Sequence, residues 1–181
     1  FRIYGKGILM YFQNFPTINY DATGSGNPQL VSDILTRVVI KKSVRDRKAL
    51  FSEYDVFDWE TPESVALDIY GKADYHWVIM MFNKYYDRYY EWPMSIPVLQ
   101  KYVSDKYANP NAVHHYETSQ SSGNTTTKIK VEVADVPTAT PVTNYEYEQN
   151  LNDARKQIKI LQPGYLGQFL EDFKGAIVPQ V

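Results

Sequence analysis

The sequence predicts an α+β fold with a small core of a helix pair and strands, a β-hairpin, and helical N- and C-terminal extensions. Two short helical patterns separated by a glycine within Thr61–Asn83 predict the core. Alternating apolar residues within Ala112–Val133 predict the hairpin, and helical spacing returns after Asn144. We expect four segments: residues 1–53 as arm and helical segment, 54–108 as core, 109–143 as hairpin and linker, and 144–181 as C-terminal helices.

Composition and charge narrow the possible functions. The 181 residues are 44% hydrophobic and 22% charged, which is typical of a folded protein. The net charge of −2 gives no electrostatic argument for nucleic-acid binding, and the absence of cysteine excludes disulfides and thiolate zinc sites. The longest strongly apolar run, Trp77–Phe82, is too short to span a bilayer. We therefore expect no nucleic-acid partner and no membrane association.

Tyrosine is unusually frequent, with 16 copies. Its ring buries a large apolar area while its hydroxyl group stays polar, so the excess favours protein–protein interfaces and, less often, stacking on sugars. The alternative, that many of these rings only cover a small core, stays open at this point.

The first part of the chain is expected to form an arm and a helix. Met10–Tyr20 is rich in aromatic residues and ends at a loop signature, Asp21–Pro28. This arm either lies on a neighbouring subunit or forms a strand docked on its own domain. Apolar spacing predicts a helix over Leu30–Val39. The basic run over residues 41–48 is either a solvated face or a surface for an acidic partner.

Two helices are expected at the centre of the chain. Thr61 is a good N-cap and Pro62 suits the first helical position. Gly71 is placed to end the first helix in the left-handed conformation. The second helix, over Asp74–Asn83, is apolar on nearly every side and should be buried. A strand over Glu53–Trp59 should precede the pair.

The next elements are a helix and a hairpin. Helical spacing after a serine cap predicts a helix over Ser95–Tyr102. Ala112–Glu117 and Thr125–Val133 predict the two strands of a hairpin, because apolar and charged residues alternate in the second strand. Ala134–Thr143 carries two prolines among small residues and is expected to be a spacer.

The C-terminal part is expected to be helical. From Asn144, apolar residues recur at intervals of four and three and predict one helix with an apolar seam formed by Tyr147, Leu151, Ala154, Ile158 and Leu161. The seam is too short for an autonomous coiled coil, so it needs a partner surface in its own domain or on another subunit. Pro163 should break this helix. A final amphipathic helix should follow, with an apolar face of Leu166, Phe169, Leu170, Phe173 and Ile177.

No residue pattern predicts catalysis or a metal site. His114 and His115 are adjacent, so on a strand their side chains should point to opposite faces, and a shared metal ion is not expected. Asp87 and Glu91 have the spacing of a carboxylate pair, but the adjacent Arg88 favours a surface ion pair. A phosphate-binding glycine loop and a nucleophile elbow are missing. We expect no enzymatic activity, no cofactor and no small-molecule substrate.

Several segments together resemble one protein family. They are Met10–Pro16 with Tyr20, the helix ending in Ile69-Tyr70-Gly71, the helix over Tyr75–Asn83, the aromatic stretch Tyr85–Trp92, Val113–Glu117, and Arg155–Ile160. In this order and spacing they resemble the gene product 53 baseplate wedge proteins of contractile-tailed bacteriophages. The resemblance implies a LysM-like core, in which two helices pack on a two-stranded sheet. The second strand of that sheet is not evident in the sequence.

The resemblance implies a structural protein of the virion, located in the tail baseplate and assembled in the host cytoplasm. It would bind other baseplate wedge proteins and help join neighbouring wedges around the hub. The expected contact residues are aromatic or apolar: Tyr11, Phe12, Phe15, Tyr85, Tyr86, Tyr89, Tyr90, Trp92, Leu151, Ile158, Phe169 and Phe173. On an exposed seam, Ile158→Asp should block assembly without unfolding the chain. The alternative function is a peptidoglycan-binding LysM module, whose aromatic residues would stack on sugars.

Overall fold

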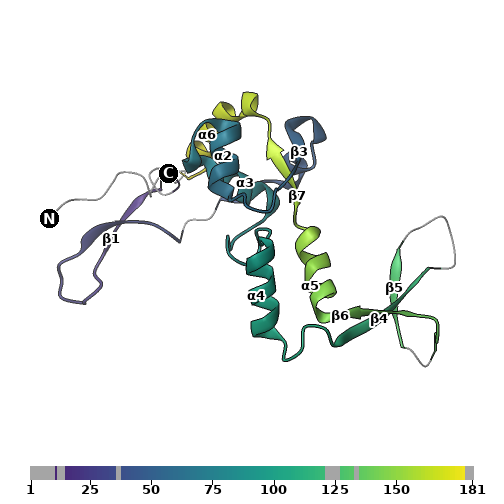
Figure 1. The fold of residues 1–181 in the computed structure, drawn as a ribbon. Helices are drawn as coiled ribbons and strands as arrows, with labels where there is room; N and C mark the ends of the chain where they lie inside the picture. Colours follow the sequence, from purple (N-terminus) through teal and green to yellow (C-terminus); the bar gives the residue numbers. More distant parts are fainter. Residues whose placement is uncertain (1–10, 12–14, 36–37, 121–126, 133–134, 178–181) are drawn as a thin grey trace. The chain divides into compact units, whose positions relative to one another are not determined.

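The computed structural model describes residues 11, 15–35, 38–120, 127–132 and 135–177, and it has the predicted α+β architecture (Figure 1). The chain divides into two compact units. Unit 1 comprises Phe1–Tyr54, Glu60–Arg88 and Ile158–Val181, and unit 2 comprises Asp55–Trp59 and Tyr89–Gln157. Unit 1 therefore draws on segments from both halves of the chain.

Unit 1 contains two small sheets and several helices. Its elements, in chain order, are β1 (Thr17–Tyr20), β2 (Gln29–Ser32), α1 (Lys42–Arg45), the 3-10 helix η2 (Lys48–Leu50), β3 (Phe51–Asp55), α2 (Pro62–Tyr70), the 3-10 helix η3 (Ala73–Tyr75), α3 (His76–Asn83), β7 (Gln157–Leu161) and α6 (Pro163–Ile177). Strand β1 pairs with β2, and β3 pairs with β7. The strand that accompanies β3 is thus supplied from far along the chain.

Unit 2 contains two helices and a three-stranded sheet. Its elements are α4 (Ile96–Lys106), β4 (Val113–Ser119), β5 (Lys128–Val131), β6 (Thr140–Thr143) and α5 (Asn144–Asp153). Figure 1 shows α4 and α5 beside each other, and α5 also contacts β4 and β6. A small buried cluster of Met94, Leu99 and Val103 packs against partly buried tyrosines in this unit.

The predicted helix pair is confirmed. The Thr61 hydroxyl accepts the N–H of Ser64 at 3.2 Å, and the Ser64 hydroxyl accepts the N–H of Thr61 at 2.9 Å. This reciprocal pair satisfies two N–H groups at the start of α2. Gly71 ends α2 with a φ of 72°, which glycine adopts without the steric cost of a Cβ. In α3, Val78 and Ile79 are fully buried, as expected.

Polar side chains connect the helix pair to β7. The Asn83 amide donates from Nδ2 to the carbonyl of Lys159 at 2.7 Å, and its Oδ1 accepts the N–H of Lys159 at 2.8 Å. The Tyr70 hydroxyl donates to the carbonyl of Leu161 at 2.9 Å. Leu161 also packs in a buried cluster with Val78 and Phe82 of α3. The position of β7 is therefore fixed by hydrogen bonds along its backbone and by apolar packing.

The predicted helix over Asn144–Leu161 is wrong in its second half. Helix α5 ends at Asp153, and the chain then forms β7. Ile158 and Ile160 are buried and alternate with exposed residues, which is the pattern of a strand with one buried face. Ile158 satisfies both a helical spacing counted from α5 and this alternation. Ile158 therefore belongs to the core of unit 1, and the predicted seam does not exist as one helical surface.

The predicted hairpin is confirmed, but the predicted spacer is wrong at its end. Strands β4 and β5 pair antiparallel, with Ser119 opposite Lys128, and their connection lies largely outside the described residues. Residues 140–143 form β6, which pairs antiparallel with the other edge of β4. Pro141 is compatible with this strand because β6 lies at the edge of the sheet, where a missing N–H is tolerated.

The helix predicted over Leu30–Val39 is also wrong at its start. Strands β1 and β2 form an antiparallel pair in which Tyr20 lies opposite Gln29. The connecting loop, predicted at Asp21–Pro28, is confirmed. The Asp21 carboxylate organises it by accepting the N–H of Gly26 at 2.7 Å and that of Thr23 at 3.1 Å. This turn brings Leu30 opposite Asn19 of β1. The strand pairing therefore outweighs the helical spacing of the apolar residues that begins at Leu30.

Three further elements are confirmed with shifted ends. The strand predicted over Glu53–Trp59 corresponds to β3, which begins and ends earlier in the sequence. The helix predicted over Ser95–Tyr102 is α4, which continues to Lys106. The final amphipathic helix is α6, and Pro163 is its first residue, where the missing N–H of proline costs nothing.

Candidate protein interface

Some of the residues expected at an interface are buried inside the chain. Phe15, Trp92, Ile158 and Phe173 are each 5% exposed or less, so their side chains contribute to the chain's own core. Tyr11, Tyr85 and Phe169 are partly buried. Phe12 lies outside the described residues. The buried side chains stabilise the chain's own fold. Fewer of the predicted contact residues are therefore accessible to a partner than the sequence indicates.

Four of the predicted residues are exposed. Tyr86, Tyr89 and Tyr90 are 79%, 72% and 61% exposed, and Leu151 is 40% exposed. We call the first three the exposed tyrosines. Tyr86 belongs to unit 1, whereas Tyr89 and Tyr90 belong to unit 2. Large rings held this far out in water are typical of surfaces that a partner covers.

Backbone and ionic contacts hold the segment that carries the exposed tyrosines. In unit 1, the Arg88 guanidinium forms an ion pair with the Glu63 carboxylate at the start of α2. In unit 2, Arg155 donates to the carbonyl of Tyr90 at 2.6 Å. Each contact restrains the backbone within its own unit, so the nearby rings lose less entropy when a partner binds them.

Tyr11 and Phe15 pack on their own unit. Tyr11 lies 5.0 Å from Phe15 and 5.2 Å from Trp77 between ring centroids, and Trp77 lies 4.6 Å from Phe173. Because Trp77 is in α3 and Phe173 is in α6, these contacts favour docking of this segment on its own domain. The hairpin of β1 and β2 continues from it along the chain.

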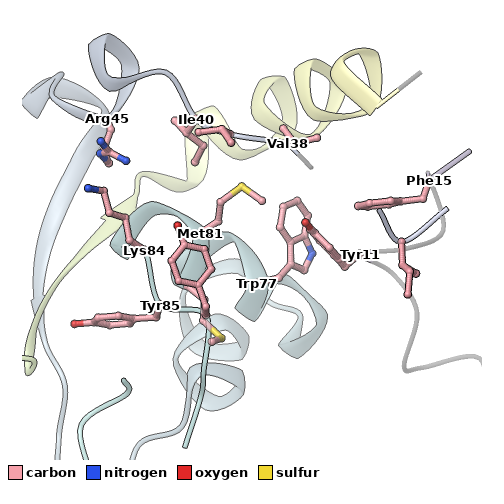
Figure 2. Close-up of a pocket in the computed structure, with 13 residues that line it drawn as sticks. Tyr11, Phe15, Val38, Ile40, Arg45, Trp77, Met81, Lys84 and Tyr85 are labelled. Atoms are coloured by element: carbon pink, nitrogen blue, oxygen red, sulfur yellow. The ribbon is translucent and has the colours of Figure 1, made fainter. Parts of the chain in front are cut away.

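Unit 1 has an apolar groove beside this aromatic cluster, with a cavity volume of about 480 Å³. Its lining comes from residues 11–45 and from α3 and the residues after it: Tyr11, Phe15, Ile34, Val38, Val39, Ile40, Arg45, Trp77, Met80, Met81, Lys84, Tyr85 and Tyr86. Figure 2 shows the side chains of Arg45 and Lys84 at one end of the view and those of Tyr11 and Phe15 at the other. The groove thus has apolar walls and one cationic end.

Sequence reasoning missed this groove and a second exposed aromatic surface. Phe57 and Trp59 are 59% and 79% exposed, and their rings stack with centroids 6.0 Å apart. Between them, the Asp58 carboxylate accepts the N–H of Ile96 at 3.0 Å, so this turn is held at the start of α4 within unit 2. The alternation of aromatic residues over 53–59 predicts a strand, so the sequence does not indicate that Phe57 and Trp59 are exposed together.

The two adjacent histidines do not point apart, contrary to the sequence expectation. Their Nδ1 atoms lie 2.8 Å from each other, and His115 Nε2 lies 2.9 Å from a Glu117 carboxylate oxygen. A register irregularity between Val113 and His115 breaks the strict alternation of β4. The His114 ring also stacks on Tyr147 at 3.9 Å. Within the described ranges, no group of three or more acidic, histidine or cysteine side chains is arranged to hold a metal ion.

Burial lowers the pKa of the His114 imidazole, because the charged form loses solvation. His115 and Lys130 lower this pKa further by charge repulsion. An ionised Glu117 carboxylate only accepts hydrogen bonds, so the nearby Nε2 of His115 is its donor. The two Nδ1 atoms form one hydrogen bond, in which one ring donates and the other accepts. The pair therefore forms a structural hydrogen-bond chain in unit 2.

Glu148 is a buried carboxylate between two donors. Its side chain is 7% exposed and accepts from Lys106 Nζ and from the Tyr107 hydroxyl, each at 2.7 Å. Burial raises the pKa of this carboxyl, but the hydrogen bonds from Lys106 and Tyr107 outweigh burial and leave the pKa below its ordinary value of 4.5. The same contact raises the pKa of Lys106. The network joins α4 to α5.

We expect Glu148→Gln to destabilise unit 2 by about 1–3 kcal/mol at neutral pH, because a charge-assisted pair becomes a neutral one in a buried place. The lowered pKa of Glu148 means that its contribution is complete above pH 4.5 and is lost as the pH falls through the folded-state pKa. Urea unfolding at neutral and acidic pH should therefore show a weaker acid dependence in the variant. Asp105→Asn, at an exposed carboxylate on α4, is the control, and equal acid dependence in Glu148→Gln and the wild type would contradict the assignment.

Among the residues that the structure describes, no helix has the length and apolar character needed to cross a membrane. A family model described as base plate wedge protein 53 matches residues 10–132, which is more than half of the chain. The matched range includes the helix pair, the exposed tyrosines and every residue that lines the groove. No curated protein matches the chain. The chain therefore belongs to the base plate wedge protein 53 family and is a structural protein of the bacteriophage tail baseplate.

Proposed function

We propose that this wedge protein binds other wedge subunits and helps join adjacent wedges around the hub of the baseplate. The observation that carries the proposal is the set of exposed tyrosines on a chain of this family. A tyrosine ring more than half exposed gains apolar burial when a partner removes it from water. Assembly with the other wedge proteins takes place in the host cytoplasm.

The division of the chain into two compact units suits a joining role. Unit 1 carries the groove and unit 2 carries the pair Phe57 and Trp59, so each unit has an apolar surface of its own. A protein that contacts two neighbours needs two such surfaces. We propose that the units bind different wedge proteins and that the exposed tyrosines contribute to these contacts.

The LysM-like core remains part of this proposal. In sequence order, β3, α2, α3 and β7 give strand, helix, helix and strand, with β3 paired to β7. This is the element order of a LysM module, in which most of unit 2 is inserted between the second helix and the second strand. The order of elements supports the fold assignment but does not identify a ligand. No contact, cavity or charge described above favours peptidoglycan, so protein binding is the proposed function.

The proposal is tested with the tagged chain co-expressed with the other wedge subunits of the same phage. The double variant Tyr89→Ala and Tyr90→Ala should weaken retention of a wedge subunit at least about tenfold, because anchor rings often contribute 2 kcal/mol or more each. Tyr165→Ala, which removes an exposed tyrosine of α6, is the matched control and should change retention less than about twofold.

Sedimentation with purified peptidoglycan tests the alternative function in the same preparation. We expect the wild-type chain to stay in the supernatant while it retains wedge subunits. A chain that sediments with peptidoglycan and retains no wedge subunit would contradict the proposed function.

A further inference from the structure

We infer that the groove of unit 1 is the docking site for one polypeptide segment of another wedge subunit, and that this segment carries an apolar side chain next to a carboxylate. The inference rests on the proposed function and adds the place and the chemistry of one contact. It depends on three observations: the exposure of the groove walls, the two cations at one end that have no carboxylate partner among the described residues, and the backbone conformation of Lys84.

The walls of the groove are apolar and accessible. Ile34 and Val39 are 68% and 79% exposed, although both line the same concavity as Trp77. Met80 and Met81 also line it, and methionine side chains adapt their shape to different apolar partners. An apolar concavity with accessible walls gains free energy when an aliphatic or aromatic side chain displaces its water.

The cationic end of the groove determines the charge of its occupant. Among the described residues, no carboxylate lies within 4.0 Å of the charged groups of Arg45 or Lys84. Figure 2 shows the charged ends of the two side chains pointing toward one another at one side of the view. Lys41, Lys42 and Lys48 lie close to Arg45 in the sequence, and Asp46 is the carboxylate among them. A carboxylate on the occupant would complement the two cations, and guanidinium binds carboxylates with two parallel hydrogen bonds.

Lys84 occupies a backbone conformation that favours glycine. It follows α3 with a φ of 60°, and no other residue besides glycine has a positive φ in the part of the chain that the structure describes. The equivalent position after α2 is Gly71, with a φ of 72°. A lysine in the left-handed region costs free energy that glycine would avoid, and such strain is concentrated at functional positions. The side chain of Lys84 therefore has a use other than ending the helix.

These observations favour a polypeptide segment over other occupants. Apart from its two cations, the groove is lined mainly by apolar and aromatic side chains, whereas phosphate groups need several clustered cations. A side chain such as leucine or phenylalanine would lie against Val39 and Met81, and an adjacent aspartate or glutamate would face Lys84. The docked segment would also cover Tyr86, which lines the same groove and is 79% exposed.

The test uses the full-length chain with the co-expressed wedge subunits, taken one at a time as probes. Lys84→Glu should weaken binding of one of them at least about tenfold, because it introduces repulsion toward a carboxylate. Lys84→Arg should retain binding within about threefold, and Lys72→Glu, an exposed lysine of unit 1 outside the groove, should change it less than about twofold. Wild-type binding should weaken as sodium chloride rises from about 0.05 M to about 0.5 M.

Lys84→Gly separates binding from folding. Glycine relieves the left-handed strain, so the unfolding midpoint should stay the same or rise, while binding should weaken at least about fivefold because the charge is lost. Val39→Asp should also weaken binding, and Val98→Asp, at an exposed valine of α4, is its matched control. If the wild type binds a wedge subunit and the groove variants bind it equally well, the groove inference fails and the proposed function stands. If the wild type binds no wedge subunit, the groove inference and the proposed function both fail. If the groove variants change only the self-association of the chain, the groove binds a second copy and the inference is overturned.

Discussion

Ile158→Asp is expected to unfold unit 1. Ile158 is 1% exposed in β7, which pairs with β3. The substitution removes a buried aliphatic side chain, worth about 2–3 kcal/mol of burial, and places a carboxylate in a position that is 1% exposed, where the charged form loses its solvation. The expected loss is at least about 4 kcal/mol, which approaches the total stability of a small domain.

The matched control is Leu151→Asp. Both residues belong to the seam that the helical spacing predicts, but Leu151 is 40% exposed on α5. It should lose less than about 1 kcal/mol, because an exposed substitution has a small effect. Circular dichroism with urea titration measures both variants. Equal and small losses would show that Ile158 lies on a helical surface after all and that the strand β7 is wrong.

Asn152→Ala is expected to destabilise unit 2 by about 2–5 kcal/mol. The Asn152 side chain is 4% exposed, accepts the N–H of Met94 at 2.7 Å and donates to the carbonyl of Met94 at 2.9 Å. Both backbone groups of Met94 lose their partner when the amide is removed, and each unsatisfied buried group costs about 1–3 kcal/mol. The Asn152 amide thus forms the two hydrogen bonds with Met94 that a neighbouring strand would form with a strand residue.

Asn150→Ala is the control on the same helix, because the side chain of Asn150 is exposed. It should stay within about 0.5 kcal/mol of the wild type, as is usual at a surface position. Hydrogen exchange at the amide of Met94 gives a second readout, since this amide should lose protection in Asn152→Ala alone. A protected Met94 amide in that variant would contradict the role assigned to Asn152.

The helix pair was predictable because its signals are local. Thr61, Pro62 and Gly71 act within one or two turns of α2, and the composition of α3 alone indicates burial. The antiparallel pairing of β4 with β5 was predictable for the same reason, because alternation within a few residues marks a strand with two different faces. In these segments local preference and tertiary environment agree.

Strand β7 was not predictable because its evidence is nonlocal. Its partner β3 lies far away in the sequence. The side chains that bind β7 are Tyr70 of α2 and Asn83 of α3. Five residues with two buried isoleucines also fit a helical spacing that continues from α5. The same limitation applies to β2, whose strand conformation depends on the turn at Asp21.

The candidate interface was predictable in composition but not in position. The sequence predicts contact residues within Tyr85–Trp92, and this stretch contains the exposed tyrosines, but Trp92 is buried. An aromatic residue has the same identity in a core and at an interface, so only the tertiary structure separates these uses. The groove needed the structure as well, because Arg45 and Lys84 are brought together by folding.

A cryo-EM reconstruction of the intact tail baseplate tests the proposed role most directly. The quantity to measure is the exposed area of Tyr89, Tyr90 and the groove residue Val39 in the assembled particle. Binding of other wedge subunits through these surfaces predicts that residues of neighbouring subunits cover all three side chains, with a carboxylate next to Lys84. A baseplate in which these side chains still face solvent would contradict it.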